Sequence, residues 1–251
     1  MTLFTNSCAE PDYLSGDGAA KGEEHLDNIE SLAAEIILIL GPKMVGDAYR
    51  RDLSAFTTEQ QLAEFACELS VCTALSRIAT RTTLRPPIKD QQKRPDAKVE
   101  ISGREVFVEV KRYSDDGPGP DGRTIALSKE LNPSVKPSKP RMMALVSKLE
   151  SVPDQLPDGA VNLLFVFHPG YGENQKYIQQ ALFGEDAFFD DPDTVALGDQ
   201  SLFAEDAWRK VSAVAYVRVA DGVLHCHELW PNPRASVVLP DNVQVAIRNL
   251  G

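Results

Sequence analysis

The chain has 251 residues, of which 43% are hydrophobic and 25% are charged, and its formal net charge at pH 7 is −11. This is the composition of a globular protein that is long enough to bury a core. The negative charge argues against a protein that coats nucleic acid non-specifically. No apolar run approaches the ~20 residues that cross a bilayer, so we expect no membrane partner, and without a signal-peptide pattern we expect a cytoplasmic location.

Two amphipathic helices are predicted in the first third of the chain. Apolar residues repeat at helical spacing from Glu23 to Leu40, and Gly41-Pro42 is expected to stop that helix. The second helix follows Thr57 or Thr58, either of which can cap it. Its inner stripe consists of Leu62, Phe65, Ala66, Leu69, Cys72, Ser76 and Ala79.

Strands dominate the rest of the chain, with helices and loops between them. In chain order we predict an extended segment (Thr82–Ile88), a hairpin (Arg94–Tyr113), two loops (Asp115–Arg123 and Asn132–Pro140), a helix (Arg141–Ser151), a buried strand (Val161–Pro169), a helix (Glu173–Phe183), an acidic loop (Gly184–Asp206) and an antiparallel pair of strands around Asp221-Gly222. This order is typical of an α/β sandwich, with helices on both faces of a small mixed sheet.

Positive charge is concentrated in one part of the sequence. The segment from Arg77 to Lys148 holds 16 Lys and Arg against nine Asp and Glu, although the whole chain is acidic. Chance clustering on a solvated face is the better explanation when the charge is taken alone. The segment also contains the predicted hairpin, however, and a basic surface around a site attracts polyanions.

The hairpin sequence "RPDAKVEISGREVFVEVKRY" alternates apolar and polar residues around Ser102-Gly103. With a two-residue turn there, Ile101 faces Arg104. Val99 then faces Val106, and one face of the hairpin becomes apolar. A register shifted by one residue would oppose apolar residues to polar ones, so the pattern itself selects this pairing.

The other face of this hairpin would oppose like charges, with Asp96 opposite Glu109 and Arg94 opposite Lys111. Directly opposed side chains have Cβ atoms roughly 4.5–5.5 Å apart, and like charges at that separation destabilise a sheet. Two carboxylates this close are tolerated if they are solvated, if one is protonated, or if a cation lies between them. A hard divalent ion bound by carboxylate oxygens allows both to stay ionised.

These residue types together suit phosphodiester hydrolysis. A metal ion held by Asp96 and Glu109 can lower the pKa of a bound water and screen the charge of a phosphate. Lys111 projects from the same strand face as Glu109, because side chains two residues apart share a face. It can position that water or stabilise charge that develops on the phosphoryl oxygens.

Pro95-Asp96 followed by Glu109-Val110-Lys111 resembles the motif of the PD-(D/E)XK nuclease superfamily, which has the restriction-endonuclease-like fold. The resemblance covers about residues 57–167. It implies an αβββαβ core, in which the Asp opens the second strand and the E-x-K lies on the third. The long Gly- and Pro-rich segment after Lys111 departs from the family pattern, and we expect it to cover the site or to contact substrate.

The resemblance also implies roles for these residues. Asp96 and Glu109 would be ligands of Mg²⁺ or Mn²⁺, the carbonyl of Val110 a further ligand, and Lys111 the catalytic lysine. Many members of the superfamily place a glutamate on the first core helix, facing the same metal.

Glu64 and Glu68 compete for the role of this helix glutamate. Glu68 borders the apolar stripe of the second helix more closely than Glu64 does, so it is expected to face the sheet. We therefore assign Glu68 as the catalytic and metal-binding glutamate.

The expected organisation is a disordered tail over residues 1–21 and a single domain over residues 22–251. The domain would consist of an N-terminal helix, the αβββαβ core at about 57–167 and an extension at 168–251 that ends in a β-hairpin.

The function expected from the resemblance is metal-dependent hydrolysis of nucleic acid, with DNA favoured over RNA. Cutting both strands of a duplex would favour a homodimer. A catalytically inactive nuclease-fold module that binds nucleic acid or protein is the main alternative. A third reading is an enzyme that uses the same acids on a small phosphate or nucleotide.

Other candidate sites in the sequence are weaker. His225 and His227 are spaced for one face of a strand but lack an evident third metal ligand. Cys67 and Cys72 are expected to be buried free thiols. The acidic loop Gly184–Asp206 carries eight acids and no base, and is expected to be solvated. The alternative is that this acidic loop mimics nucleic acid and shields the basic site.

Overall fold

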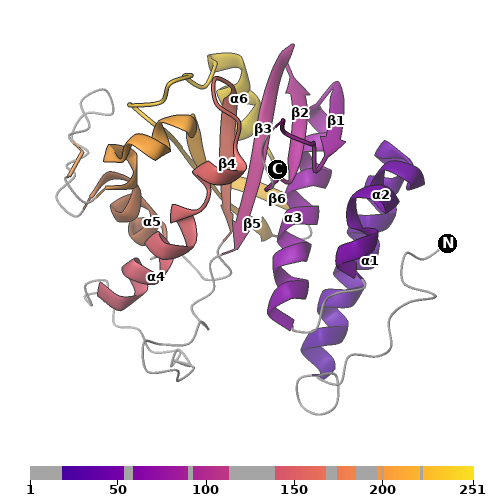
Figure 1. Cartoon of the computed structure of the whole chain (residues 1–251). Coiled ribbons are helices and arrows are strands. Elements are labelled where there is room, and N and C mark those ends of the chain that lie inside the picture. The colour runs from indigo at the N-terminus through magenta and orange to yellow at the C-terminus, as the bar shows by residue number, and fades with distance from the viewer. Residues whose placement is uncertain are drawn as a thin grey trace.

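A computed structural model describes residues 19–53, 59–89, 93–112, 139–167, 174–184, 197–198, 201–220 and 223–251 of the chain. These residues form an α/β fold with one open sheet of six strands and six α-helices (Figure 1). The helices are α1 (Ala19–Leu40), α2 (Pro42–Leu53), α3 (Glu59–Ile78), α4 (Lys139–Glu150), α5 (Asn174–Phe183) and α6 (Asp241–Arg248). The strands are β1 (Arg81–Leu84), β2 (Ala97–Ile101), β3 (Arg104–Arg112), β4 (Val161–Phe167), β5 (Ala213–Ala220) and β6 (Val223–Pro231).

The sheet is mixed, and its six strands lie side by side in chain order. β2 runs antiparallel to both of its neighbours, β1 and β3. β4 and β5 continue in parallel with β3, and β6 returns antiparallel to β5. The antiparallel pair predicted near the C-terminus is therefore confirmed as β5 and β6. It extends the central sheet itself, so it is not a separate appendage.

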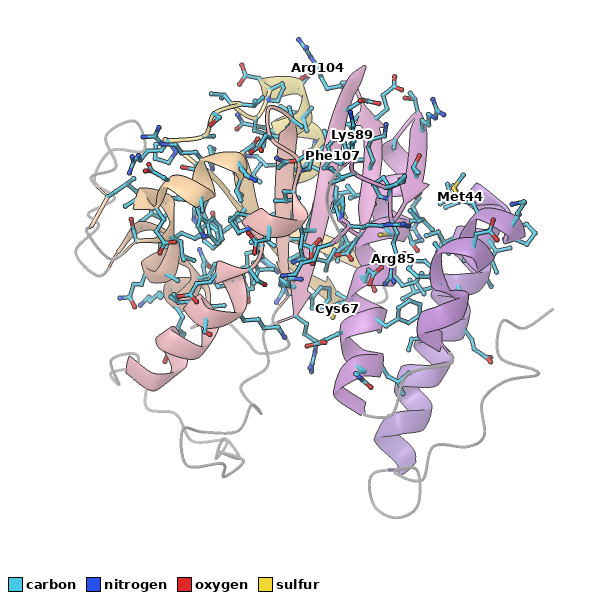
Figure 2. All side chains as sticks on the ribbon, viewed as in Figure 1. Met44, Cys67, Arg85, Lys89, Arg104 and Phe107 are labelled. Atoms are coloured by element: carbon cyan, nitrogen blue, oxygen red, sulfur yellow. The ribbon has the colours of Figure 1, made fainter. Side chains whose placement is uncertain are left out.

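Helices cover both faces of the sheet, as predicted. α1 and α3 lie on one face, where they share a hydrophobic core with β2, β3 and α6. α4 and α5 lie on the other, packed with the 3₁₀ turns η3 (Leu202–Ala204) and η4 (Asp206–Lys210) against β4 and β5. Figure 2 shows side chains filling the space on both sides of the strands. β4 is buried along almost its whole length, which agrees with its continuous apolar sequence.

The register of the β2–β3 hairpin is confirmed. Ile101 pairs with Arg104, Val99 with Val106 and Ala97 with Val108. Ser102 and Gly103 both have positive φ, 52° and 74°, as the two central residues of a type I′ turn require. This turn matches the twist of the flanking strands, and Gly103 adopts it without a steric penalty.

Two helices of the structure are absent from the sequence prediction. Gly41 does end α1, with φ at 86°, but Pro42 opens α2 instead of opening a loop. Proline is favoured at the first position of a helix, where its missing N–H has no partner to lose. α6 follows Pro240 in the same way and buries Val243 and Ile247.

Several predictions fall on residues outside the described part of the chain. These are residues 1–18 of the predicted tail, the caps Thr57 and Thr58, the loop Asp115–Arg123, most of the loop Asn132–Pro140 and most of Gly184–Asp206. Lys139 and Pro140 of the second of these loops are helical, because α4 begins at Lys139. The last three residues of the predicted tail are helical, because α1 begins at Ala19. Cys67 and Cys72 are buried free thiols, as expected. Within the described ranges no helix is both long and apolar enough to cross a membrane.

Candidate active site

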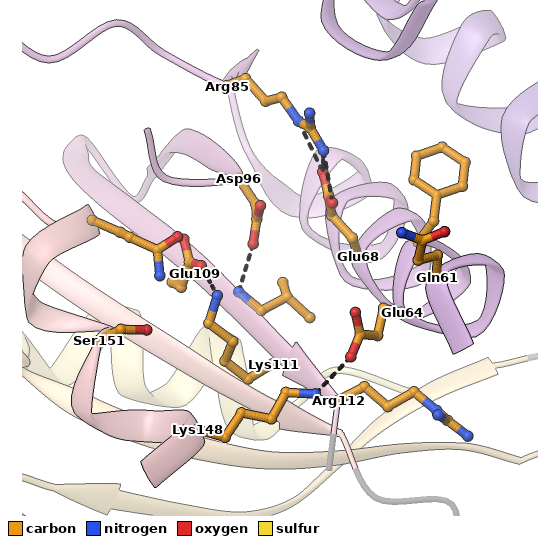
Figure 3. Close-up of a pocket in the computed structure, with 13 residues that line it drawn as sticks. Gln61, Glu64, Glu68, Arg85, Asp96, Glu109, Lys111, Arg112, Lys148 and Ser151 are labelled. Atoms are coloured by element: carbon orange, nitrogen blue, oxygen red, sulfur yellow. Dashed lines mark hydrogen bonds and ion pairs between the residues drawn. The ribbon is translucent and has the colours of Figure 1, made fainter. Parts of the chain in front are cut away.

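A pocket of about 390 Å³ opens where α3, the beginning of β2, the second half of β3 and the end of α4 meet (Figure 3). It contains the four predicted catalytic residues, Glu68, Asp96, Glu109 and Lys111, and Val110 also lines it. Residues that lie far apart in the sequence are therefore brought to one place. The other lining residues are Gln61, Glu64, Phe65, Arg85, Arg112, Lys148, Ser151 and Gln155.

Asp96 reaches the site by a different route from the one predicted. The ladder between β2 and β3 ends at Ala97 and Val108, so Asp96 is not a paired strand residue opposite Glu109. Its Oδ2 instead accepts a hydrogen bond from the backbone N–H of Val110 at 2.7 Å. The Val110 N–H points toward the β2 edge, but the ladder ends at Ala97, so β2 offers this N–H no backbone carbonyl. The Asp96 carboxylate thus takes the place of the missing ladder partner.

The predicted pair of Arg94 and Lys111 is wrong for the same reason, since β2 does not extend back to Arg94. Arg94 is exposed and does not line the pocket that holds Lys111. The two cations, Arg94 and Lys111, are therefore not directly opposed as like charges. The two acids stay close enough for the charge of Asp96 to act on Glu109.

Glu109 is the most deeply buried acid of the site, with only 1% of its surface exposed. Burial, and then the charge of Asp96, raises the pKa of Glu109 to about 8, against the opposing effect of Lys111. Its Oε1 accepts a hydrogen bond from the Lys111 ammonium. Its Oε2 is buried and has no hydrogen-bond partner among the described residues. An orphaned carboxylate oxygen is costly, and it marks a place where a ligand would be stabilised.

Lys111 lies two residues beyond Glu109 and projects from the same face of β3, as predicted. Burial lowers the pKa of its ammonium, but the adjacent carboxylate of Glu109 outweighs this effect, and the pKa is raised overall. Lys111 is therefore protonated at neutral pH. About a fifth of its side chain is exposed to the pocket, so it is reachable by a bound molecule.

The structure separates the two candidate glutamates of α3. Glu68 lies near Asp96 and Glu109, and burial and these two charges raise its pKa to about 8, against the effect of Arg85. Glu64 instead forms an ion pair with Lys148 of α4 at 2.6 Å. Glu68 is thus the helix glutamate that faces the two acids of the hairpin, in agreement with the assignment made from its position beside the apolar stripe.

Arg85 is the residue of this site that sequence reasoning missed. Its Nη2 donates to both oxygens of Glu68, at 3.1 and 3.0 Å, and its guanidinium lies over the ring of Tyr49, 5.1 Å from the centroid. Its backbone has φ of 45°, a conformation that costs a non-glycine residue on the order of 1–3 kcal/mol. The backbone N–H of Arg85 donates to the carbonyl of Asp96 at 2.8 Å, which holds this turn in place. Strained residues of this kind cluster at functional sites.

The carboxylates of the pocket fit a hard metal ion in part. Among the described residues, no group of three or more His, Cys, Asp and Glu side chains could by itself enclose a metal. Mg²⁺, however, is bound through one or two carboxylates, and waters and substrate phosphates complete its coordination. Asp96 and the orphaned Oε2 of Glu109 are donors of this kind. The Glu68 carboxylate is paired with Arg85 and would have to separate from it before it could bind the same metal ion.

Four cations line the same pocket, which partly bears out the concentration of positive charge noted in the sequence. Lys111, Arg85 and Lys148 are each paired with an acid of the pocket, Glu109, Glu68 and Glu64 respectively (Figure 3). Arg112 is the fourth cation of the lining. A phosphate that entered would meet positive charge beside the acids.

The described residues of this chain match no protein-family model, no curated protein and no solved structure. His225 and His227 of β6 belong to no group of metal-ligand side chains within the part of the chain that the structure describes. What the protein does is therefore inferred from its own residues, and the pocket at the hairpin is where acids, a lysine and cations converge.

Proposed function

We propose that this protein is a metal-dependent phosphodiesterase of the PD-(D/E)XK type, an endonuclease that hydrolyses nucleic acid, DNA in preference to RNA. The observation that carries the proposal is the buried Glu109 carboxylate, whose Oε2 has no partner among the described residues, beside Asp96 and the protonated Lys111. A buried acid with a strongly raised pKa in a pocket is typical of functional sites.

The order of elements supports the family assignment. A helix, three antiparallel strands, a helix and a parallel strand follow each other as α3, β1, β2, β3, α4 and β4. This agrees with the αβββαβ core that the motif implies. Asp96 immediately precedes β2, and Glu109, Val110 and Lys111 lie on β3, as in the superfamily pattern.

Asp96, Glu109 and the carbonyl of Val110 would hold Mg²⁺ or Mn²⁺, with Glu68 as a further ligand once it separates from Arg85. When bound, the ion would supply a water of lowered pKa and screen the phosphate's charge. The residues of the chain do the rest. Lys111, freed from Glu109, donates a hydrogen bond to the attacking water or to a phosphoryl oxygen. The Val110 N–H fixes the Asp96 carboxylate in place.

A catalytically inactive nuclease-fold module is the second candidate, and two ion pairs favour it. Lys111 and Arg85 each neutralise an acid that the reaction needs, Glu109 and Glu68. A binding module could retain this arrangement permanently. The net charge of −11 also favours a protein that binds nucleic acid only at a limited surface.

The two candidates are distinguished by incubating the full chain with labelled single- and double-stranded DNA and RNA, in Mg²⁺, Mn²⁺ or EDTA. We expect cleavage only with a divalent metal, and its loss in Lys111→Ala. Lys98→Ala, which removes a lysine of the same strand face outside the pocket, is the matched control. Binding without cleavage under every condition would favour the inactive module, and equal cleavage by wild type and Lys111→Ala would contradict the proposed mechanism.

A further inference from the structure

A second and larger hollow, of about 1060 Å³, adjoins the candidate active site. The two share Arg85, Asp96 and Gln155 in their linings, so they lie next to each other. The second hollow lies between α2 and the ends of β1 and β2, and Figure 1 shows α2 on the β1 side of the sheet. The proposed function rests on α3 and the β2–β3 hairpin, and α2 is not part of that site.

The lining of the second hollow combines cations with an apolar surface. Lys43, Arg85 and Arg94 supply positive charge, and Leu40, Met44 and Leu84 supply apolar contact area. Met44 is 39% exposed, although a large apolar side chain without a partner is more stable when it is covered. Cations beside an apolar floor suit a ligand that has both anionic groups and flat apolar faces.

The lining of this hollow has three cations and two acids, and one of the cations, Arg85, is paired with Glu68. Asp47 pairs with Lys43 at 2.7 Å, but both side chains are largely exposed, at 62% and 89%. An exposed pair of this kind contributes little stability, so a phosphate can compete for Lys43. Asp96 is already engaged by the Val110 N–H at the boundary with the active site. Arg94 is exposed at the edge of the hollow.

We infer that the second hollow binds an unpaired strand of nucleic acid where it continues from the phosphate held in the active site. Proteins bind single strands through cations that follow the phosphates and through side chains on which the bases stack, most often aromatic ones. Here Met44 and Leu84 supply the apolar surface. In a duplex the base faces are stacked and paired, so the Met44 surface would have nothing to contact. This inference rests on the proposed function, which supplies the position of the phosphate.

The test is fluorescence polarisation of the full-length chain in EDTA, where no cleavage is expected, with a labelled single-stranded DNA, the RNA of the same sequence and the DNA duplex. Arg94→Ala removes a cation of the hollow, and Met44→Glu places an anion on its floor. Two matched controls make the same changes of charge elsewhere. Arg104→Ala lies at the far tip of the hairpin, away from Met44 and Arg85 in Figure 2, and Val245→Glu lies on an exposed position of α6.

We expect the wild type to bind the single strands more tightly than the duplex. Arg94→Ala should reduce the slope of log K against log salt by about 0.7, the contribution of one phosphate on a single strand. Met44→Glu should weaken single-strand binding by roughly tenfold, while both controls bind as the wild type does. Tighter binding of the duplex, no single-strand binding by the wild type, or unchanged binding by both hollow variants would overturn the inference.

Cleavage by the same proteins separates this inference from the proposed function. If the wild type cleaves with Mg²⁺ and the hollow variants bind and cleave like it, the inference fails and the function stands. If single strands bind through Arg94 and Met44 but no metal supports cleavage, the hollow is confirmed and the nuclease activity is not.

Discussion

The two ends of the β2–β3 hairpin carry the same kinds of residue on the same face. At the tip, Glu100 and Glu105 are directly opposed, and Lys98 pairs with Glu105 at 2.8 Å. At the base, Asp96 lies near Glu109, and Lys111 pairs with Glu109. Each end thus has two acids and one lysine within reach of each other. They differ chiefly in exposure, because the Glu105 side chain is 65% exposed and that of Glu109 only 1%.

This difference in exposure reverses the pKa shift. The hydrogen bond and charge of Lys98 lower the pKa of Glu105. Burial and the charge of Asp96 raise the pKa of Glu109 despite the lysine beside it. At the tip, water solvates the like charges, so their opposition needs no further explanation. At the base the same opposition persists without water, which is why only the base is a candidate for metal binding and catalysis.

The largest difference between the two ends should appear in cleavage activity when one acid is removed at each end in turn. Glu109→Gln keeps the shape of the side chain but removes the charge that would hold the metal, so we expect Mg²⁺-dependent cleavage of labelled DNA to fall by more than about 100-fold. Glu105→Gln makes the identical change at the tip and should cleave as the wild type does. Equal losses in the two variants would show that the hairpin as a whole, and not its buried base, supports activity.

The hairpin register could be predicted because its causes are local. Alternation of apolar residues and the Ser102-Gly103 turn select one pairing, and the structure has that pairing. Glu68 was also predictable, since its place beside the apolar stripe of α3 directs it toward the sheet. α2 was missed because Gly41-Pro42 was taken only as a helix stop, although Pro42 opens α2. α6 lies in a part of the chain for which the sequence analysis predicts no element.

The remaining features of the site depend on contacts between distant residues. Asp96 accepts a hydrogen bond from the Val110 N–H because the β2–β3 ladder stops at Ala97 and Val108. It thus stops one residue short of the predicted pair of Asp96 and Glu109. Arg85 reaches Glu68 and Tyr49 only through its positive φ, which no local pattern in the sequence indicates. The degree of burial that separates Glu109 from Glu105 follows from α3 and α4 packing around the base. A single sequence does not specify these contacts.

An intermediate effect concerns stability and pH in EDTA. Because the pKa of Glu109 is raised from 4.5 to about 8, the folded state holds a proton that the unfolded state releases above pH 4.5. The stability that this proton contributes is fully present below pH 4.5 and is lost as the pH rises to about 8. We expect urea denaturation to give a free energy of unfolding that falls as the pH rises over this range.

The corresponding substitutions test which end is responsible for this loss. Glu109→Gln should reduce the decline, and the part that the raised pKa of Glu68 contributes should remain. Glu105→Gln should leave it intact and act only at acid pH, because a lowered pKa contributes stability that is lost as the pH falls. A decline that persists unchanged in Glu109→Gln would assign the titration to another group, with Glu68 the next to replace.

The smallest effect is expected for the lysine at the tip. In the pair between Lys98 and Glu105 the Glu105 side chain is 65% exposed and that of Lys98 is 30% exposed, and ion pairs at the surface contribute about 0–1 kcal/mol. Lys98→Ala should therefore change the free energy of unfolding by less than about 1 kcal/mol, and this change should shrink further in high salt. A large, salt-independent loss would show that the tip is not the solvated counterpart that the comparison requires.

The most direct test of the site is a calorimetric titration of the apo protein with Mn²⁺ at pH 7, in two buffers of different ionisation enthalpy. Since the pKa of Glu109 is raised to about 8, a metal that binds its carboxylate must displace a proton. We predict that the wild type and Glu105→Gln bind Mn²⁺ with release of about one proton, and that Asp96→Asn binds at least roughly tenfold more weakly. Equal binding and equal proton release in Asp96→Asn would contradict a metal site at the base of the hairpin, as would no binding by the wild type.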